Sequence, residues 1–352
     1  MNYKYLTVIF LYIMSSCAQE KADITISVED KMEIRDVLTL NNFNPIATSD
    51  DSGQYIALMN ISNPAEVAVV DNQGNKVNLF DEQGSGPGEL ERVLYLGFKN
   101  SDTIAVFDDM HMRFTSYTID SNNYEQYTFE AEEKGYSVVS GILEFCDNRW
   151  YSAIDVAGVP ASPDTPILAK FDRSFNELEL FGEYDPFFEN ERDVLQRPIM
   201  SVDCNSDKIY TTHYKIPYIQ VYDLETHELI ERVDHEPPSF NLSEQFVPQI
   251  TDQTEWQDFR IEEQSSSGPV ISTDDLLIHT FYNSTANFYE SRDLTERDQY
   301  IATYDKEDYT YYGEKAIEGL VMGSTHNGKI IELYDQDVNS ITLRLLRIEI
   351  EV

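Results

Sequence analysis

The chain is poor in basic residues. Its 352 residues include 25 Lys and Arg against 64 Asp and Glu, which gives a formal net charge of −39. A protein that binds DNA or RNA needs a basic surface that displaces counterions from the phosphates, so this deficit argues against nucleic acid as a partner. It also argues against direct electrostatic attachment to anionic lipid. The excess of carboxylates predicts a solvated surface whose charges repel one another.

Cysteine is scarce as well, with three residues in the whole chain. A disulfide framework is therefore excluded. Cys146 and Cys204 each end an apolar segment just before a turn, as if one structural position were repeated. Two cysteines permit one disulfide at most, and we expect buried free thiols, with that single disulfide as the alternative.

Long hydrophobic runs are absent except near the N-terminus. Residues 6–14 (LTVIFLYIM) are apolar, but a helix needs about 20 such residues to span a bilayer. The run is followed by Ser15, Ser16 and Cys17, which together resemble the lipobox of bacterial lipoproteins. Met14 departs from the usual Leu, and an ordinary secretory signal is the alternative.

The lipobox resemblance implies that Cys17 becomes the acylated N-terminus. Residues 1–17 are then a signal peptide, and residues 18–23 (AQEKAD) are a polar tether. Several acyl chains on one residue are enough for stable anchoring. By the same resemblance, we expect a cell-envelope protein anchored by lipid in the outer membrane, with the periplasmic or surface side left open.

Repeated turn signals divide the rest of the chain. Short clusters of Asn, Asp, Ser and Gly are each followed by a run rich in β-branched and aromatic residues, at 51–53, 100–102, 147–148, 205–207, 274–275 and 327–328. A second such run typically ends in an aspartate, at Asp71, Asp172, Asp223 and Asp305. The spacing indicates a structural repeat of about 50 residues.

The runs are short and lack the 3.6-residue period of an amphipathic helix, so we predict an all-β chain. Four strands per repeat and six repeats predict a six-bladed β-propeller with four-stranded antiparallel blades. We assign residues 24–352 to this single domain. Because the chain ends in a long apolar strand, we expect an N-terminal strand to complete the last blade and close the ring.

One repeat carries a family resemblance. Residues 84–90 (GSGPGEL), 103–108 (TIAVFD), Arg113 and 117–120 (YTID) resemble an NHL-type repeat. The same glycine-rich signature is similar to that of the TolB-like six-bladed propeller lipoproteins of Gram-negative bacteria. The motif is clear in one blade only, and the other blades match by strand spacing. The resemblance implies a fold and a location and no particular activity.

The lengths of the predicted loops differ between the two faces of the disc. Strands alternate in direction, so the first and third turns of each blade share one face, and the second connection and the link to the next blade share the other. All the long segments belong to the second set: 155–166, 183–197, 235–268 and 282–299. Loops that a rigid scaffold presents together often carry function, so we predict that this is the binding face. Simple tolerance of insertions is the alternative.

Candidate site residues follow from this assignment. The ends of the second strands would lie at the mouth of the channel: Met59, Asp108, Ile154, His213, Phe281 and Tyr334. Asp108 and His213 are the candidate catalytic groups. The ligand-binding candidates surround them: Arg92, Asp109, His111, Arg113, Arg197, Tyr214, Lys215 and Tyr282. Cations gathered at one mouth would favour an anion, and for each residue a structural ion pair is the alternative.

Linear enzyme motifs are missing: the sequence has no G-x-S-x-G, H-E-x-x-H, paired C-x-x-C or Walker loop. Residues 335–339 begin like a calcium loop, but Ser340 and Leu346 replace the Gly and Glu that the loop requires. We therefore predict no cofactor and no metal site, with calcium as the alternative.

The 23 Tyr and 18 Phe suit contacts with a protein, peptide or glycan. We expect a monomeric, non-catalytic binding or scaffold protein that touches the membrane only through its anchor. The alternative is a channel-centred, metal-dependent hydrolase or lyase.

Overall fold

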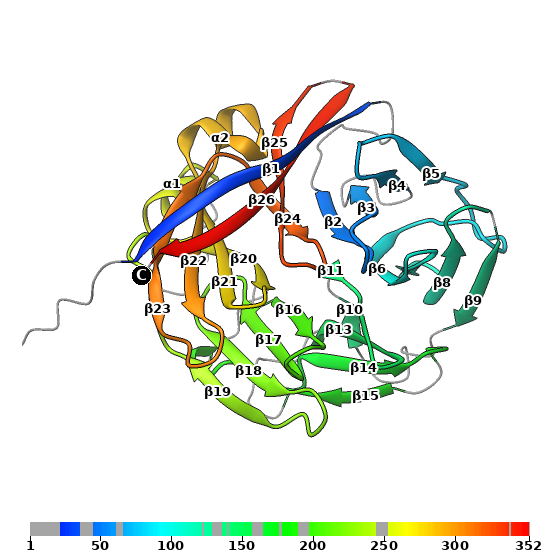
Figure 1. Ribbon diagram of the computed structural model, residues 1–352, viewed down its shortest axis with the longest axis horizontal. Helices are drawn as coiled ribbons and strands as arrows, with labels where there is room; N and C mark the ends of the chain where they lie inside the picture. The colour runs from blue at the N-terminus through cyan, green and yellow to red at the C-terminus, as the bar shows by residue number, and fades with distance from the viewer. Residues whose placement is uncertain are drawn as a thin grey trace, which may run out of the picture.

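A computed structural model places six β-sheets around a common axis (Figure 1). The structure describes residues 22–35, 45–60, 66–121, 123–128, 136–138, 141–156, 165–175, 178–188, 197–243, 253–337 and 339–351. The predicted signal peptide, Cys17 and most of the tether lie outside these residues. None of the helices in the described ranges is long and apolar enough to cross a membrane.

The six sheets are the blades, and each has four strand positions from the axis to the rim. Blade 1 contains β2 (Pro45–Ser49), β3 (Tyr55–Asn60), β4 (Val67–Asp71) and β5 (Lys76–Phe80). Blade 2 contains β6 (Val93–Asn100), β7 (Thr103–Asp108), β8 (Arg113–Thr118) and β9 (Tyr124–Thr128). Blade 4 contains β16 (Pro198–Asp203), β17 (Lys208–His213), β18 (Ile219–Asp223) and β19 (Leu229–Val233).

The innermost strand of blade 3 is broken into short pieces. β10 (Tyr136–Val138) and β12 (Glu144–Cys146) pair with opposite ends of β13 (Arg149–Val156), and β11 (Gly141–Ile142) between them pairs in parallel with β6 of blade 2. Blade 3 continues with β14 (Leu168–Asp172) and β15 (Leu178–Phe181), followed by the 3-10 turn η1 (Pro186–Phe188).

Blade 5 carries helical insertions on its connections. Its strands are β20 (Ser265–Ser272), β21 (Leu276–Asn283), β22 (Asp298–Asp305) and β23 (Tyr311–Ile317). Helix α1 (Gln253–Glu262) precedes β20, and helix α2 (Ala286–Ser291) and the 3-10 turn η2 (Leu294–Glu296) lie between β21 and β22. Both α-helices of the described residues thus lie on connections of blade 5.

The N-terminal strand closes the ring, as predicted. Blade 6 consists of β24 (Leu320–Ser324), β25 (Ile330–Gln336), β26 (Ser340–Glu351) and, outermost, β1 (Asp23–Arg35). β1 pairs antiparallel with β26 along its whole length, from Asp23 opposite Glu351 to Arg35 opposite Ser340. This pairing removes the open edge that β26 would otherwise present.

Six hydrophobic clusters fill the spaces between blades, one at each interface. The middle strands are therefore buried on both faces, which explains why runs such as 55–59 (YIALM) are continuously apolar instead of alternating. β1 contributes to two of these clusters: Met32 and Ile34 pack towards blade 1, and Ile24 packs towards blade 5.

The repeated aspartates at strand ends form the third turn of their blades. The Oδ1 atom of Asp223 accepts hydrogen bonds from the backbone N–H groups of Thr226 (2.7 Å) and Glu225 (3.0 Å). Asp71 and Asp305 bind the backbone of their own turns in the same way. The bond from Thr226 is the main cause that lowers the pKa of Asp223. These aspartates recur because each replaces a backbone acceptor in a tight turn.

The expectation of free thiols is wrong, because Cys146 and Cys204 form a disulfide with their Cα atoms 5.8 Å apart. Cys146 ends β12, and Cys204 directly follows β16. These strands are the innermost strands of neighbouring blades, and neighbouring blades come closest near the axis. The repeated position that the sequence indicated is therefore the reason why the two thiols meet.

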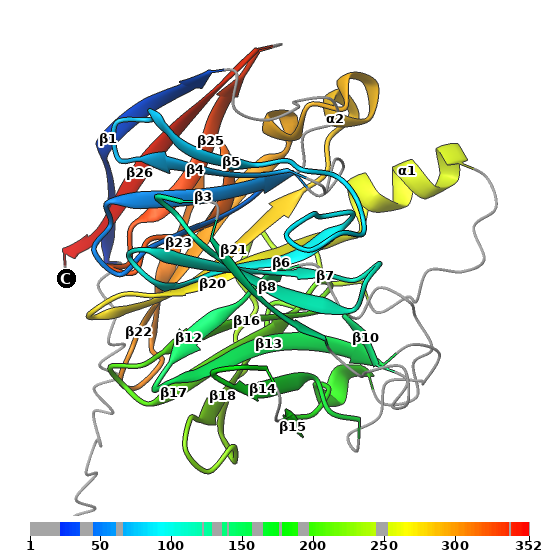
Figure 2. The same cartoon turned by 90° about the vertical axis from the view of Figure 1, so that its right-hand side faces the viewer.

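Strand direction divides the molecule into two faces. The first and third turns of the blades form what we call the short-turn face, and the remaining connections form the long-loop face. Figure 2 shows α1 and α2 together on the right, with the C-terminus on the opposite side. Because Asp23 pairs with Glu351, the described chain also begins on the short-turn face.

Glycine 323 allows two innermost strands to approach each other. A Cβ atom at this position would collide with the backbone carbonyl oxygen of Ala47 in blade 1, which cannot move aside as a flexible side chain could. At Gly141 the added Cβ would meet only the ring of Tyr95, at an ordinary contact distance of 3.4 Å. The two glycines thus differ in how tightly the backbone is packed around them.

We predict that Gly323→Ala lowers the free energy of unfolding by about 2–3 kcal/mol, the upper range for overpacking a rigid site. Gly141→Ala is the matched control and should change it by less than about 1 kcal/mol. Urea unfolding followed by fluorescence measures both. Equal midpoints for the two variants would contradict the close approach of blades 6 and 1.

Candidate functional site

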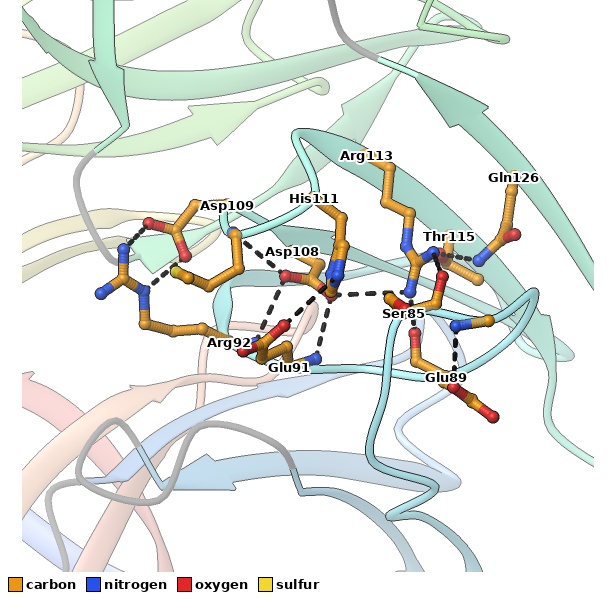
Figure 3. A network of polar contacts seen from close by, with 12 residues as sticks. Ser85, Glu89, Glu91, Arg92, Asp108, Asp109, His111, Arg113, Thr115 and Gln126 are labelled. Carbon is orange, nitrogen blue, oxygen red and sulfur yellow. Dashed lines mark hydrogen bonds and ion pairs between the residues drawn. The ribbon is translucent and has the colours of Figure 1, made fainter.

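Asp108 is the centre of a polar network on the long-loop face of blade 2 (Figure 3). It ends β7 and is fully buried. Its carboxylate accepts hydrogen bonds from the backbone N–H groups of Glu91 (3.0 Å) and Met110 (3.2 Å) and from Nδ1 of His111 (2.9 Å). The guanidinium of Arg113 lies 3.7 Å away. Asp108 therefore joins the loop at Glu91, the turn at Met110 and the side chain of Arg113.

The glycine-rich motif builds the loop that Asp108 holds. The carboxylate of Glu89 folds back and accepts a hydrogen bond from the backbone N–H of Gly86 (2.7 Å). A Cβ atom at Gly84 or Gly86 would collide with this side chain. Arg113 donates to the carbonyl oxygens of Glu89 and Ser85. In this chain the motif thus supplies local structure and no phosphate cradle.

The basic candidate residues of blade 2 each lie beside a carboxylate. Arg92 forms an ion pair with Asp109, and His111 lies between Asp108 and Glu91 (3.3 Å). Arg113 is paired with Asp108 as described. The five candidates from this blade therefore form an internally neutralised network, and the structure does not support an anion site there.

His213 lies in blade 4, apart from Asp108 in blade 2, and it is fully buried. Its ring packs between those of Phe188 and Tyr184, at centroid distances of 5.1 and 5.4 Å. Burial lowers the pKa of His213 to about 4, so the ring is neutral at pH 7. Neither Asp108 nor His213 is accessible to a substrate in this structure, which argues against the predicted catalytic roles.

The predicted channel mouth needs a correction for the same reason. Five of its six residues are buried, namely Met59, Asp108, Ile154, His213 and Phe281. They belong to second strands, whose side chains face the neighbouring blades. The axial cavity, of about 90 Å³, opens instead near the short turns and is lined by the ends of the innermost strands.

Glu144 in this axial cavity is a group that the sequence analysis missed. Burial, with a smaller effect of Asp51, raises its pKa to about 7. A carboxyl with this pKa exchanges a proton readily at neutral pH. No cluster of three or more His, Cys, Asp or Glu that could hold a metal ion occurs in the described ranges.

Two of the predicted ligand-binding residues meet on the long-loop face. Tyr214 follows β17 of blade 4, Tyr282 lies near the end of β21 of blade 5, and their hydroxyl oxygens are 2.6 Å apart. Two further predicted ligand-binding residues lie beside Tyr214, and their exposure differs: Lys215 is buried, and Arg197 is exposed. The carbonyl oxygen of Arg197 accepts a hydrogen bond from the backbone N–H of Tyr214 (3.0 Å).

Two arginines complete this group. Arg260 of α1 donates through Nη2 to Ser266 Oγ (2.6 Å) and to the hydroxyl of Tyr214 (3.3 Å). The guanidinium of Arg297 contacts the rings of Phe288 and Tyr282, at 4.0 and 4.3 Å from their centroids. We call Tyr214, Arg260, Tyr282 and Arg297 the Tyr–Arg cluster. The sequence analysis missed both arginines because it assigned no helix to the long segments that carry them.

Local capping fixes the position of Arg297. The hydroxyl of Thr285 accepts a hydrogen bond from the backbone N–H of Phe288 (3.1 Å) and so begins α2. Asp293 begins η2 in the same way, through the backbone N–H of Thr295 (2.9 Å). Arg297 directly follows η2, while Phe288 is buried under α2. Helix α2 and turn η2 thus hold the phenyl ring of Phe288 and the guanidinium of Arg297 against each other.

The Tyr–Arg cluster holds a buried arginine beside two phenols. Arg260 is 5% exposed. Burial alone would raise the pKa of the Tyr214 hydroxyl, but Arg260 and the hydrogen bonds from Ser266 and Tyr282 lower it. Burial and the neighbouring Tyr214 raise the pKa of Tyr282. Tyr214 is therefore the more acidic phenol of the pair.

Comparisons with known proteins bear on the fold alone. No protein-family model and no curated protein matches the chain. A solved member of the DUF4221 family from Bacteroides vulgatus is similar in structure, with a TM-score of 0.67 and 12% sequence identity over 94% of this chain and 99% of that chain. A putative exported protein from Bacteroides fragilis is also similar, with a TM-score of 0.54 and 12% identity over 94% of this chain and 96% of that chain.

We predict that Asp108→Asn lowers the free energy of unfolding by about 3 kcal/mol or more, because Arg113 would remain buried without its carboxylate. Asp109→Asn removes the partner of the half-exposed Arg92 and should lower it by less than about 1 kcal/mol. Thermal and urea unfolding of the two variants measure the difference. An Asp108→Asn variant as stable as the parent chain would contradict the structural role.

Proposed function

We propose that this protein is an exported, lipid-anchored binding protein that recognises a protein, peptide or glycan on its long-loop face. The observation that carries the proposal is the Tyr–Arg cluster. There the turn after β17, helix α1 and the α2–η2 insertion, from separate parts of the chain, bring aromatic and arginine side chains together. The short turns of the opposite face are largely stabilised by their own aspartates.

Three features support export and anchoring. A structural disulfide such as Cys146–Cys204 persists in oxidising compartments and is rare in the cytosol. The structurally similar protein from Bacteroides fragilis is described as a putative exported protein. The lipobox-like segment that ends at Cys17 supplies the anchor in this proposal, and membership in the TolB-like, NHL-containing lipoproteins of the outer membrane is part of it.

The position of β1 suggests how the two faces are oriented relative to the membrane. The described chain begins on the short-turn face, where Asp23 pairs with Glu351. A tether of a few residues leading to Cys17 would hold that face towards the membrane. The long-loop face would then point away from the lipid, where it is free to meet a ligand.

The anchor is tested by Cys17→Ala in the full-length protein. We expect the wild-type chain to fractionate with membranes and to incorporate a labelled fatty acid, and the variant to lose the label and to leave the membrane fraction. A Cys17→Ala variant that stays membrane-bound would refute lipid anchoring at this residue.

The binding face is tested by hydrogen exchange on the full-length protein in detergent. A panel of oligosaccharides and peptides is first screened for compounds that raise the melting temperature. We expect a bound compound to slow amide exchange in residues 214–218, α1 and α2, and to leave the turns at 51–54 and 205–207 unchanged. Protection of the short turns alone, or a panel in which nothing binds, counts against the proposed face.

A further inference from the structure

Buried and half-buried arginines of this chain are usually paired with a fully buried carboxylate. Arg232 lies 2.7 Å from Asp185, and Arg344 lies 2.6 Å from Glu332. The third such pair is Arg113 with Asp108. All three carboxylates have no exposed surface. This pattern agrees with the cost of placing a guanidinium in a site that water reaches poorly.

The Tyr–Arg cluster departs from this pattern. Within the described residues, neither Arg260 nor Arg297 lies within 4 Å of a carboxylate oxygen, although the chain has 64 Asp and Glu. The cluster supplies phenol and serine hydroxyls to Arg260 instead. Two positive charges are therefore held close together with no acidic partner from the parts of the chain that the structure describes.

Arg297 is a candidate receptor for a planar anion. Its guanidinium packs against the rings of Phe288 and Tyr282, which restrict its movement. It forms no hydrogen bond in the described structure, and its Nε atom is buried without a partner. Because Nε is buried, the edge open to a ligand is that of the two Nη atoms, which can bind a carboxylate through two parallel hydrogen bonds.

We propose that the Tyr–Arg cluster binds the carboxylate of a uronic acid residue in a glycan. The carboxylate accepts hydrogen bonds from the edge of Arg297, and the positive charge of Arg260 strengthens the attraction. The hydroxyls of Tyr214 and Tyr282 lie beside the anion and pair with sugar hydroxyls. This inference rests on the proposed function, because it names the ligand class of the long-loop face.

A glycan suits the surroundings better than a peptide does. Trp256, Tyr214, Tyr282 and Tyr289 are all partly exposed at or near the cluster, and they combine flat apolar faces with polar tips. Peptides that add a strand to a sheet need an open strand edge. In the described blades, the open edges belong to the outermost strands, and none of the four residues of the cluster lies on one of them.

The internal alternative is that Tyr214 itself neutralises Arg260 as a phenolate. In that case the phenolate compensates the positive charge of Arg260, and the cluster needs no anionic ligand. Ultraviolet absorption distinguishes the two: a phenolate at pH 7 absorbs near 295 nm, and that absorption disappears in Tyr214→Phe. We expect no such band at pH 7, and its presence would overturn the proposal.

The direct test is calorimetric titration of the full-length protein with oligosaccharides of galacturonate, glucuronate and mannuronate. Each acidic compound is compared with its neutral, carboxyl-reduced form. We expect at least one acidic compound to bind and its neutral form to bind at least tenfold more weakly. We also expect the affinity to fall with rising salt.

Variants locate the binding. Arg297→Gln should weaken binding of the acidic oligosaccharide at least tenfold, and Arg297→Lys should restore only part of it, because lysine lacks the planar fork. Arg292→Gln is the matched control: it removes an exposed arginine close by, and binding should be unchanged. Circular dichroism and melting temperature confirm that each variant is folded.

The outcomes separate this inference from the proposed function. If none of the acidic oligosaccharides binds, or if neutral forms or peptides bind as well as they do, the uronate inference is wrong. The proposed function then still stands if another compound protects the long-loop face from hydrogen exchange. If no compound protects that face, the proposed function fails as well.

Discussion

Pairing of β1 with β26 is the interaction on which the rest of this structure depends. It joins residues from the two ends of the described chain into one blade, and it buries Met32, Ile34 and Ile24 between that blade and both of its neighbours. A propeller without this strand would expose an open edge and two incomplete interfaces. Closure also places the start of the described chain on the short-turn face, where Asp23 pairs with Glu351.

Charge pairing distinguishes structural groups from candidate ligand-binding groups in this acidic protein. The sequence makes Asp108 a catalytic candidate, yet its bonds to the backbone and to Arg113 make it part of the scaffold. Arg260 and Arg297 show the opposite situation, since each is partly or fully buried and neither has a carboxylate partner in the described chain. A buried charge that the fold leaves unpaired is a better indication of a ligand than a charge that happens to lie near a strand end.

The sequence predicted the fold in detail because propeller strands and turns are local. Turn residues such as Asp223 act within a few positions, and blade number follows from their spacing. The candidate site is formed by contacts between residues far apart in the sequence, so the sequence predicted less of it. The predicted topology places Tyr214 and Tyr282 on the long-loop face, where the structure has them, but Arg260 reaches Tyr214 only through helix α1, which the sequence analysis did not predict. The thiols of Cys146 and Cys204 meet through the same kind of long-range geometry.

Native-state hydrogen exchange on the full-length protein tests ring closure most directly. If β1 completes the sixth blade, the amides of β1 and β26 exchange only through the global unfolding reaction, with the same free energy as those of β7 in blade 2. The dependence on denaturant should then match as well. Exchange of β1 at a markedly lower free energy, with β7 still protected, would show that the N-terminal strand is not part of the closed ring, and the placement of the tether on the short-turn face would lose its basis.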